Sequence, residues 1–212
     1  MRFRFFVLRM KLLRKHAIMT PYEEKTDMRK NFGKKTIITP LPVVIIGTYD
    51  ENGVPNAMNA AWAGQIDSHQ IIISLAKHKT TDNLLLKNEF TVSFATRDTA
   101  AASDYFGIES GKGINKIEKA GFHVTKGEYT DAPVFAEYPL TLECKVVEMK
   151  PDTEGYLLIG ETVNMTVDES ILTDGKIDLG KMEPIMFDSA MNKYRVVGEI
   201  VCDAFKAGAQ FK

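Results

Sequence analysis

The stretch SLAKHKTTDNLLLKNEF, residues 74–90, joins the end of one element to the start of the next. The apolar run QIIISL, residues 70–75, predicts a buried strand. Thr80 or Thr81 can cap a helix over residues 81–88, and three consecutive leucines give that helix an apolar side. The stretch therefore predicts a strand that runs directly into the N-terminus of a short helix.

The strand-to-helix junction gathers groups that attract an anion. Lys77 and Lys79 bring ammonium charges, and Thr80 and Thr81 bring hydroxyls. A helix N-terminus adds backbone N–H groups that have no partner within the helix. Together these groups suit a phosphate. The alternative is an ordinary capped helix with solvated lysines, and this stretch alone leaves both interpretations open.

Outward from the junction, strand-like runs alternate with turn signals along most of the chain. These runs occupy residues 36–50, 90–96, 139–149 and 156–168. The sequence DENG, residues 50–53, predicts a hairpin turn, and the alanines and glycines of residues 98–121 predict two short helices around an irregular loop. The pattern predicts a mainly β fold with helical insertions, built as a largely antiparallel barrel.

Two of these runs also predict which side chains share a face. In residues 139–149 apolar and polar residues alternate, so Cys144 is expected to face the core. In residues 156–168 the odd positions from Leu157 to Val167 are mostly apolar and are expected to share one face.

Composition narrows the classes of function. The chain has 212 residues, a length that suits one sizeable core. Its net charge is -1, so no general attraction to nucleic acid or anionic membranes is expected. Its two cysteines, Cys144 and Cys202, show neither CxxC nor Cys/His spacing. They argue against a zinc site or a disulfide scaffold and suit a reducing compartment, so a cytoplasmic protein without a bound metal is expected.

The N-terminal segment MRFRFFVLRMKLLRKH is basic and apolar, but its longest uncharged run is too short to span a membrane. Strand patterning begins only near Lys35. We therefore expect residues 1–34 to be an extension outside the fold, with Met19 or Met28 as an alternative start, and residues 35–212 to form one domain.

Several common enzyme signatures are absent from the sequence. ESGKGINK, residues 109–116, lacks the spacing of a P-loop, and no GxGxxG, HExxH or GxSxG motif occurs. No residue stands out as an acid, a base or a nucleophile, so the catalytic residues are left unassigned.

The sole tryptophan lies in NAMNAAWAG, residues 56–64. Trp62 in an apolar run is by default a core aromatic. Its small neighbours Ala60 and Ala61 would nevertheless let a flat ligand approach the backbone, and Asn59 could bond its heteroatoms. A flat aromatic ligand that carries a phosphate would use both this strand and the strand-to-helix junction.

Six segments in order resemble the flavin reductase-like family of FMN-binding split-barrel proteins, and its flavoredoxin-like members in particular. The segments are NAMNAAWAG, SLAKHKTTDNLLLKNEFTVSF, DYFGIESGKGINKIEKAGF, APVFAEYPLTLECKVVE, IGETVNMTVDE and DGKIDLGKMEPIMFDSAMNKYRVVGE. The resemblance covers residues 35–208. It implies a six-stranded antiparallel split barrel that forms a homodimer, with one FMN near the interface in each half.

The resemblance also implies three groups of cofactor-binding residues. The FMN phosphate would be held by Lys79 and Thr80, with help from Ser74, Lys77 and Asn83. The isoalloxazine ring would lie against Asn59, Ala60, Ala61 and Trp62. The loop SGKGINK would contribute Ser110, Gly111 and Lys116.

The function that the resemblance implies is an FMN-binding oxidoreductase in which NAD(P)H reduces the flavin. One alternative is a flavoredoxin-type protein that passes electrons between protein partners, and another is a module that stores or senses flavin. The chain departs from the family at Gly155, where relatives often carry a histidine beside the strand LLIGE. If that histidine serves hydride transfer or nicotinamide binding, its absence weakens the reductase interpretation.

Overall fold

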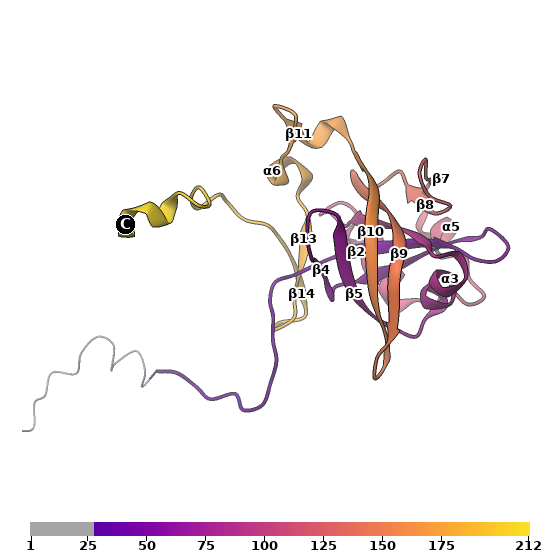
Figure 1. Cartoon of the computed structure of the whole chain (residues 1–212), viewed down its shortest axis with the longest axis horizontal. Coiled ribbons are helices and arrows are strands. Elements are labelled where there is room, and N and C mark those ends of the chain that lie inside the picture. Colours follow the sequence, from indigo (N-terminus) through magenta and orange to yellow (C-terminus); the bar gives the residue numbers. More distant parts are fainter. Residues whose placement is uncertain (1–27) are drawn as a thin grey trace, which may run out of the picture. The chain divides into compact units, whose positions relative to one another are not determined.

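The computed structural model describes residues 28–212 (Figure 1). Contacts divide the chain into two units, residues 1–36 and residues 37–212. Most of the predicted extension over residues 1–34 lies outside the described residues, so that boundary stays a prediction. Within the described part no helix is long and apolar enough to cross a membrane.

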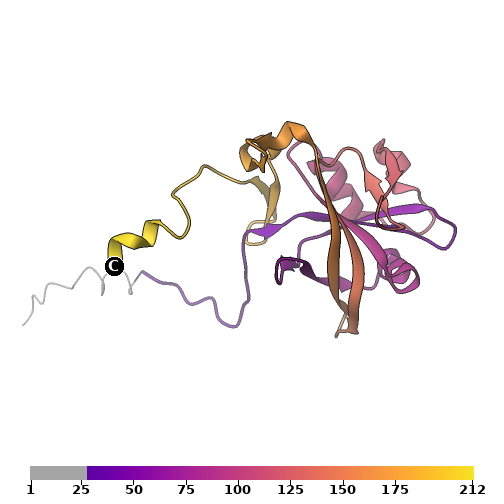
Figure 2. The same ribbon diagram turned by 45° about the horizontal axis from the view of Figure 1, so that its top comes forward.

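One curled antiparallel sheet of seven strands forms the body of the second unit (Figures 1 and 2). Its strands, in spatial order, are β3 (Pro55–Ala60), β2 (Val44–Tyr49), β6 (Glu89–Phe94), β9 (Leu140–Pro151), β10 (Gly155–Val167), β5 (Gln70–Ala76) and β4 (Ala63–Gln65). The curled sheet confirms the predicted mainly β split barrel with helical insertions.

The predicted count of six strands is wrong by one for this sheet. The segment NAMNAAWAG breaks at Ala61 and Trp62 into β3 and β4, which pair with different strands. β3 pairs with β2, whereas β4 pairs with β5 at the other edge of the sheet. The break lets the chain pass from one edge of the open barrel to the other.

Helices and short strands fill the connections. The helices are α3 (Lys79–Lys87), α4 (Ala100–Ile108), α5 (Lys116–Ala120) and α6 (Leu179–Met182), with 3-10 turns at Glu169–Ile171 and Ala207–Phe211. Small antiparallel sheets are formed by β1 (Leu41–Pro42) with β13 (Ile185–Asp188) and β14 (Lys193–Val196), by β7 (Val124–Lys126) with β8 (Pro133–Phe135), and by β11 (Leu172–Thr173) with β12 (Lys176–Ile177). The predicted hairpin turn at residues 50–53 is confirmed, with Gly53 at positive φ.

Apolar side chains pack on both faces of β2. Ile46 points into the barrel, where it joins a cluster that includes Phe90 and Cys144. Ile45 points to the other face and packs in a second cluster with Phe106 of α4. Cys144 is fully buried, as its strand pattern predicts. Because α4 is anchored in the second cluster, its C-terminal end is held beside the sheet.

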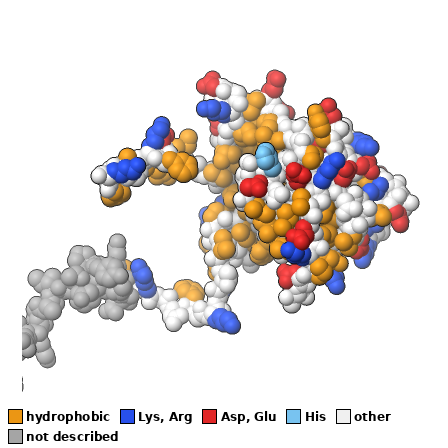
Figure 3. Space-filling model, viewed as in Figure 1, with side chains coloured by type: hydrophobic (Ala, Val, Ile, Leu, Met, Phe, Trp, Pro, Cys, Tyr) orange, Lys and Arg blue, Asp and Glu red, His pale blue; other side chains and the backbone are white. Residues whose placement is uncertain are grey.

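The predicted apolar face of β10 is wrong for the first half of the strand. Leu158 is buried in the barrel core, whereas its neighbours Leu157 and Ile159 are partly exposed. The pairing of β10 with β9 changes register between Ile159 and Gly160, and again between Thr162 and Asn164. These irregularities shift the alternation of side chains between the two faces of β10. Figure 3 shows hydrophobic side chains gathered over β5 and β10 on the face that it draws.

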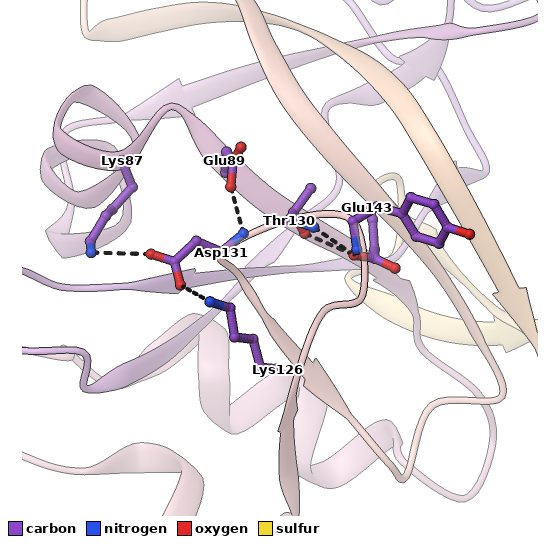
Figure 4. Close-up of polar contacts among 7 residues, drawn as sticks. Lys87, Glu89, Lys126, Thr130, Asp131 and Glu143 are labelled. Atoms are coloured by element: carbon purple, nitrogen blue, oxygen red, sulfur yellow. Dashed lines mark hydrogen bonds and ion pairs between the residues drawn. The ribbon is translucent and has the colours of Figure 1, made fainter.

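A buried carboxylate ties the loop between β7 and β8 to the sheet (Figure 4). Glu143 of β9 is 1% exposed, and its Oε2 accepts hydrogen bonds from Tyr129 N at 2.8 Å, from Thr130 N at 3.0 Å and from Thr130 Oγ1 at 3.0 Å. Asn164 Nδ2 donates to Oε1 at 2.9 Å. Burial alone would raise the pKa of Glu143, but these hydrogen bonds outweigh burial and hold the pKa below its ordinary value.

Ion pairs fix the end of the same loop. Asp131 lies 3.4 Å from Lys87 Nζ and 3.1 Å from Lys126 Nζ, and its backbone N donates to Glu89 Oε2 at 2.5 Å. Figure 4 shows these contacts beside the Glu143 cluster. The loop therefore connects α3 with the sheet strands β6 and β9.

Candidate functional site

Two adjoining cavities lie where β3, the start of α3 and the end of α4 meet. The first cavity has a volume of 210 Å³ and the second a volume of 360 Å³. Both are lined by Met58, Asn59, His78, Gly107 and Ile108. Shared walls of this kind make one continuous site with two ends.

The first cavity contains the N-terminus of α3. The helix begins at Lys79, two residues before the predicted start. The prediction that Thr80 or Thr81 caps the helix is also wrong, because His78 occupies the cap position. Thr81 instead closes the turn, since its Oγ1 accepts from His78 N at 2.9 Å and donates to His78 O at 2.7 Å. The unpaired backbone N–H groups of the first turn therefore belong to Lys79 and Thr80.

Lys79 and Thr80 place a positive charge and a hydroxyl on the wall of this cavity. Lys79 Nζ lies 3.4 Å from Asp50 Oδ2, which holds the ammonium in place and leaves donors available. Thr80 is buried, and its Oγ1 accepts from Asn56 Nδ2 at 2.8 Å. Because the hydroxyl oxygen is already an acceptor, its own proton is available to an anion.

The loop after α4 closes the first cavity from the opposite side. Ser110 and Gly111 both line it. A Cβ at position 111 would lie 2.2 Å from Asn56 Oδ1 and 3.6 Å from Lys79 Cγ, so a side chain there would displace the Asn56 amide. The loop segment predicted from SGKGINK thus lies directly against the start of α3.

Lys116 reaches the same cavity from α5 but is tied to α4. Its Nζ donates to the carbonyl oxygens of Phe106 and Glu109 at 3.0 Å each, and the residue is 4% exposed. Burial lowers the pKa of Lys116 to about 8, while the negative charge of Glu109 opposes the shift. Lys116 therefore caps the C-terminal end of α4 and keeps a third donor for the cavity.

The second cavity has a flat, small-residue wall. Ala60, Ala61 and Trp62 line it where β3 ends, and Ser74 lines it from β5. Trp62 is 64% exposed, so it is not the core aromatic of the default interpretation. Asn59 Nδ2 donates to Ser103 O at 2.8 Å, which leaves the Asn59 side-chain oxygen free to accept.

Sequence reasoning missed the other wall of the second cavity. Asp104 of α4, Phe187 of β13 and Tyr194 of β14 line it. Tyr194 Oη donates to Asp104 Oδ1 at 2.8 Å, and burial together with the Asp104 charge raises the pKa of Tyr194 to about 12. The segment MEPIMFDSAMNKYRVVGE contains two of these residues, but no local pattern shows that a C-terminal hairpin folds back onto α4.

Two predicted residues lie away from both cavities. Lys77 is exposed and lines neither of them. Asn83 is buried inside the fold, where its Nδ2 donates to Thr48 Oγ1 at 3.0 Å. The remaining ten predicted residues line the first cavity, the second cavity or both.

A third cavity of 500 Å³ shares Trp62 and residues 74–76 of β5 with the second cavity. Its other wall is the turn of residues 152–154 together with Gly155, the first residue of β10. A Cβ at Gly155 would lie 1.9 Å from Leu75 O, so this backbone admits no side chain there. The absence of a histidine at this position is thus built into the packing of β10 against β5.

The donors at the first cavity suit a phosphate ester, and the small-residue wall of the second suits a flat ring. Among the described residues no group of three His, Cys, Asp or Glu side chains is placed to hold a metal ion. The lining of the two cavities suits the binding and orientation of an anionic, planar ligand.

Comparisons with known proteins identify the family. The model of the flavin reductase like domain matches residues 37–187. Flavoredoxin of Desulfovibrio vulgaris (Miyazaki F) is 36% identical, with a TM-score of 0.81 that covers 85% of this chain and 100% of that chain. Flavoredoxin from Methanosarcina acetivorans is 29% identical, with a TM-score of 0.80 over 87% of this chain and 99% of that chain.

A more distant relative comes from Aquifex aeolicus (strain VF5). This uncharacterized protein is 22% identical over 158 residues, which are 70% of this chain and 81% of the relative. The family model spans most of the second unit, including β2 to β13. The chain therefore belongs to the flavin reductase-like family.

Proposed function

We propose that this protein is an FMN-binding oxidoreductase in which NAD(P)H reduces the flavin. The observation that carries the proposal is the pair of adjoining cavities, one at a helix start whose donors suit a phosphate and one with a flat wall. FMN has a phosphate at one end and a planar ring at the other, and the order of the two cavities matches that layout.

Lys79, Thr80 and the first backbone N–H groups of α3 would hold the phosphate, and Gly111 lets the loop close over it. Their charge-assisted hydrogen bonds would supply much of the preference for a phosphorylated ligand. Ser110 and Lys116 line the same cavity and would add donors there. The carbonyl contacts of Lys116 keep its ammonium group near the tail of the ligand.

Asn59, Ala60, Ala61 and Trp62 would contact the ring, with Ser74 beside them. FMN, when bound, supplies two-electron redox chemistry that no side chain of this protein provides. The chain would orient the ring, and the side chains of Trp62 and Phe187 would exclude water from it. The raised pKa of Tyr194 would keep its hydroxyl group protonated. None of these residues needs to act as an acid, a base or a nucleophile.

Purification of the native protein tests the cofactor first. A yellow protein that releases FMN on heat denaturation supports the proposal, whereas a colourless protein that binds neither FMN nor riboflavin overturns it. Steady-state oxidation of NADH and NADPH, with free flavin as acceptor, then tests the donor. Rapid turnover supports the reductase function, and the ratio of the two rates identifies the preferred nucleotide.

A second candidate is a flavoredoxin-type protein that carries electrons between protein partners. Two observations favour it: the full-length match to flavoredoxin at 36% identity, and the glycine at position 155 that admits no side chain beside the third cavity. This candidate predicts bound FMN with slow NAD(P)H oxidation. Fast reduction of the bound flavin by a reduced electron-transfer protein would then identify its physiological role.

We also propose that the protein works as a homodimer in the cytoplasm. The open barrel leaves apolar residues at its edge, which a second subunit would cover. Cys144 and Cys202 are both free thiols, as a reducing compartment allows. Sedimentation of the FMN-loaded protein tests the dimer, and a monomer at micromolar concentration would contradict it.

A further inference from the structure

The end of the chain carries apolar side chains that pack on nothing. Every residue from 198 to 212, here called the C-terminal arm, is exposed. Ile200, Val201, Phe205 and Phe211 are each at least 88% exposed. The family model ends at residue 187, so the arm lies beyond the matched domain.

The composition of the arm is that of a packed segment. Tails that remain solvated are rich in charge and poor in aromatic and β-branched residues. The arm instead has four large apolar residues against four charged ones, and three small residues, at positions 207–209, lie between Phe205 and Phe211. Four large apolar side chains in water expose a sizeable apolar surface, and burial of that surface would be favourable. The arm therefore requires a surface to cover.

The barrel provides an apolar surface that is itself uncovered. A cavity of 420 Å³, here called the barrel groove, opens from the surface to the core residues Ile73, Val92 and Leu142. Met165 lines it and is 51% exposed. Figure 3 shows the hydrophobic side chains that gather over β5 and β10, two of the strands that frame the groove. Asp67 is the one acidic residue of its lining.

We propose that the C-terminal arm of one chain docks in the barrel groove of a second copy. In one described chain the arm and the groove are both open, so the arm does not fill its own groove. Exchange between two copies forms two identical contacts about a two-fold axis, which closes the assembly. Phe205 would enter the groove, and the adjacent Lys206 would meet Asp67 of the partner.

The inference rests on the proposed homodimer, for which it specifies a contact, and it does not depend on FMN. It assigns a role to residues outside the cofactor cavities, and it locates the surface that joins the subunits. It is therefore tested by association, with or without flavin.

The first test compares the mass of the full chain with that of a chain ending at Val197, by sedimentation velocity across a concentration series. The full chain is expected to be a dimer. Loss of the arm should weaken the dimer by about a hundredfold or more, because several large apolar side chains lose their burial site. The arm makes no contact with its own core, so the truncated chain should keep the melting temperature of the monomeric fold.

Matched variants locate the contact. Phe205→Ser should weaken the dimer as truncation does, whereas Lys212→Gln should leave it within about twofold, since a surface charge contributes little. Met165→Lys places a charge at the groove mouth and should also give monomers. A mixture of the truncated chain and the Met165→Lys chain should form heterodimers, because one intact arm and one intact groove remain.

Cys202 provides a probe inside the arm. It is exposed, whereas Cys144 is buried and its pKa is raised to about 12, so a nitroxide reagent labels Cys202 alone. The label should be mobile in dilute protein and immobilised as the concentration rises, with the same midpoint as the mass. Met165→Lys should keep the label mobile.

Three outcomes overturn the proposal. They are a full chain that is monomeric at micromolar concentration, a truncated chain that dimerises as strongly as the full chain, and a Met165→Lys chain that dimerises through an arm still immobilised at Cys202. A chain that lacks residues 1–34 is the control for the other terminus. If that deletion alone abolishes association, the N-terminal segment rather than the arm is the docking element.

Discussion

Lys79 decides whether the start of α3 is a phosphate site or an ordinary helix N-terminus. If it binds the phosphate, Lys79→Ala removes a charge-assisted hydrogen bond and should weaken FMN by about 1.5–3 kcal/mol, or about one to two decades. Thr80→Ala should cost less, because the hydroxyl is neutral. Riboflavin has the same ring without the phosphate, so its affinity should barely change in either variant.

Calorimetric titration of both ligands into apoprotein measures these effects. Lys77→Ala is the matched control, since this lysine is exposed and lines neither cavity. Equal weakening of FMN and riboflavin by Lys79→Ala, or no weakening of either, would place the phosphate elsewhere.

Lys116 should give the protein a pH-dependent stability in the alkaline range. Its pKa falls from 10.5 to about 8 in the folded protein. Between these values the unfolded chain binds more protons than the folded one, so this residue makes the free energy of unfolding rise with pH. The stabilising contribution of this residue is complete above pH 10.5, and it is lost as the pH falls through the folded pKa of about 8.

Urea unfolding at several pH values across that window measures the effect. Lys116→Met removes the titrating group and should abolish this part of the pH dependence, although it also frees the carbonyl groups at the end of α4. Parallel curves for the two proteins would show that Lys116 keeps an ordinary pKa.

At the scale of elements, the loop between β7 and β8 depends on one carboxylate. Glu143→Gln replaces an accepting oxygen with an NH2 group that faces the donors of Thr130, and it should destabilise the fold by about 1–3 kcal/mol. Glu148→Gln on the same strand is the control, because Glu148 is partly exposed and, within residues 28–212, forms an ion pair with Lys150 alone.

The same variant should change the acid limb of stability. The pKa of Glu143 is below its ordinary value of 4.5 in the folded protein, so its contribution is present above that value and is lost as pH falls through the folded pKa. Wild type should therefore lose stability below about pH 4.5 more steeply than Glu143→Gln. An unchanged acid limb would show that the cluster does not stabilise the ionised form.

The elements also show where sequence patterns stop being informative. Alternation along β9 correctly placed Cys144 in the core, because β9 pairs with β6 in regular register at that position. The alternation of residues in β10 did not predict its buried face, because changes of register against β9 exchange the faces to which odd and even positions point. Such changes of register depend on the neighbouring strand rather than on local sequence. Helix α3 begins two residues before its predicted start, because Thr81 Oγ1 forms hydrogen bonds with the backbone of His78. The prediction considered only Thr80 and Thr81 as cap residues.

At the scale of the whole molecule, the fold explains which residues of the candidate site could be predicted from the sequence. Ten of the twelve predicted residues line the cavities because the resemblance carries the order of their segments. The resemblance also implies Lys77 and Asn83, yet Lys77 is exposed and Asn83 is buried inside the fold. Asp104 and Tyr194 are ninety residues apart, and only the tertiary fold brings their side chains together.

The two termini should tolerate deletion to different extents. Removal of residues 1–34 should leave the melting temperature and the FMN content unchanged, since the second unit begins at residue 37. Removal of residues 1–42 should lower both, because it deletes β1, which pairs with β13 at Phe187 in the second cavity. Loss of holoprotein in the shorter deletion would show that the extension belongs to the fold.

The break between β3 and β4 leaves Trp62 at the edge of the second cavity, and no other tryptophan exists in the chain. Ultraviolet excitation of the protein therefore produces indole emission from one known position. In the apoprotein this emission should have the long wavelength of a solvated indole, since the side chain is 64% exposed. A flavin beside it would accept its excitation energy, so the chain carries its own optical gauge of whether the ring end of the site is filled.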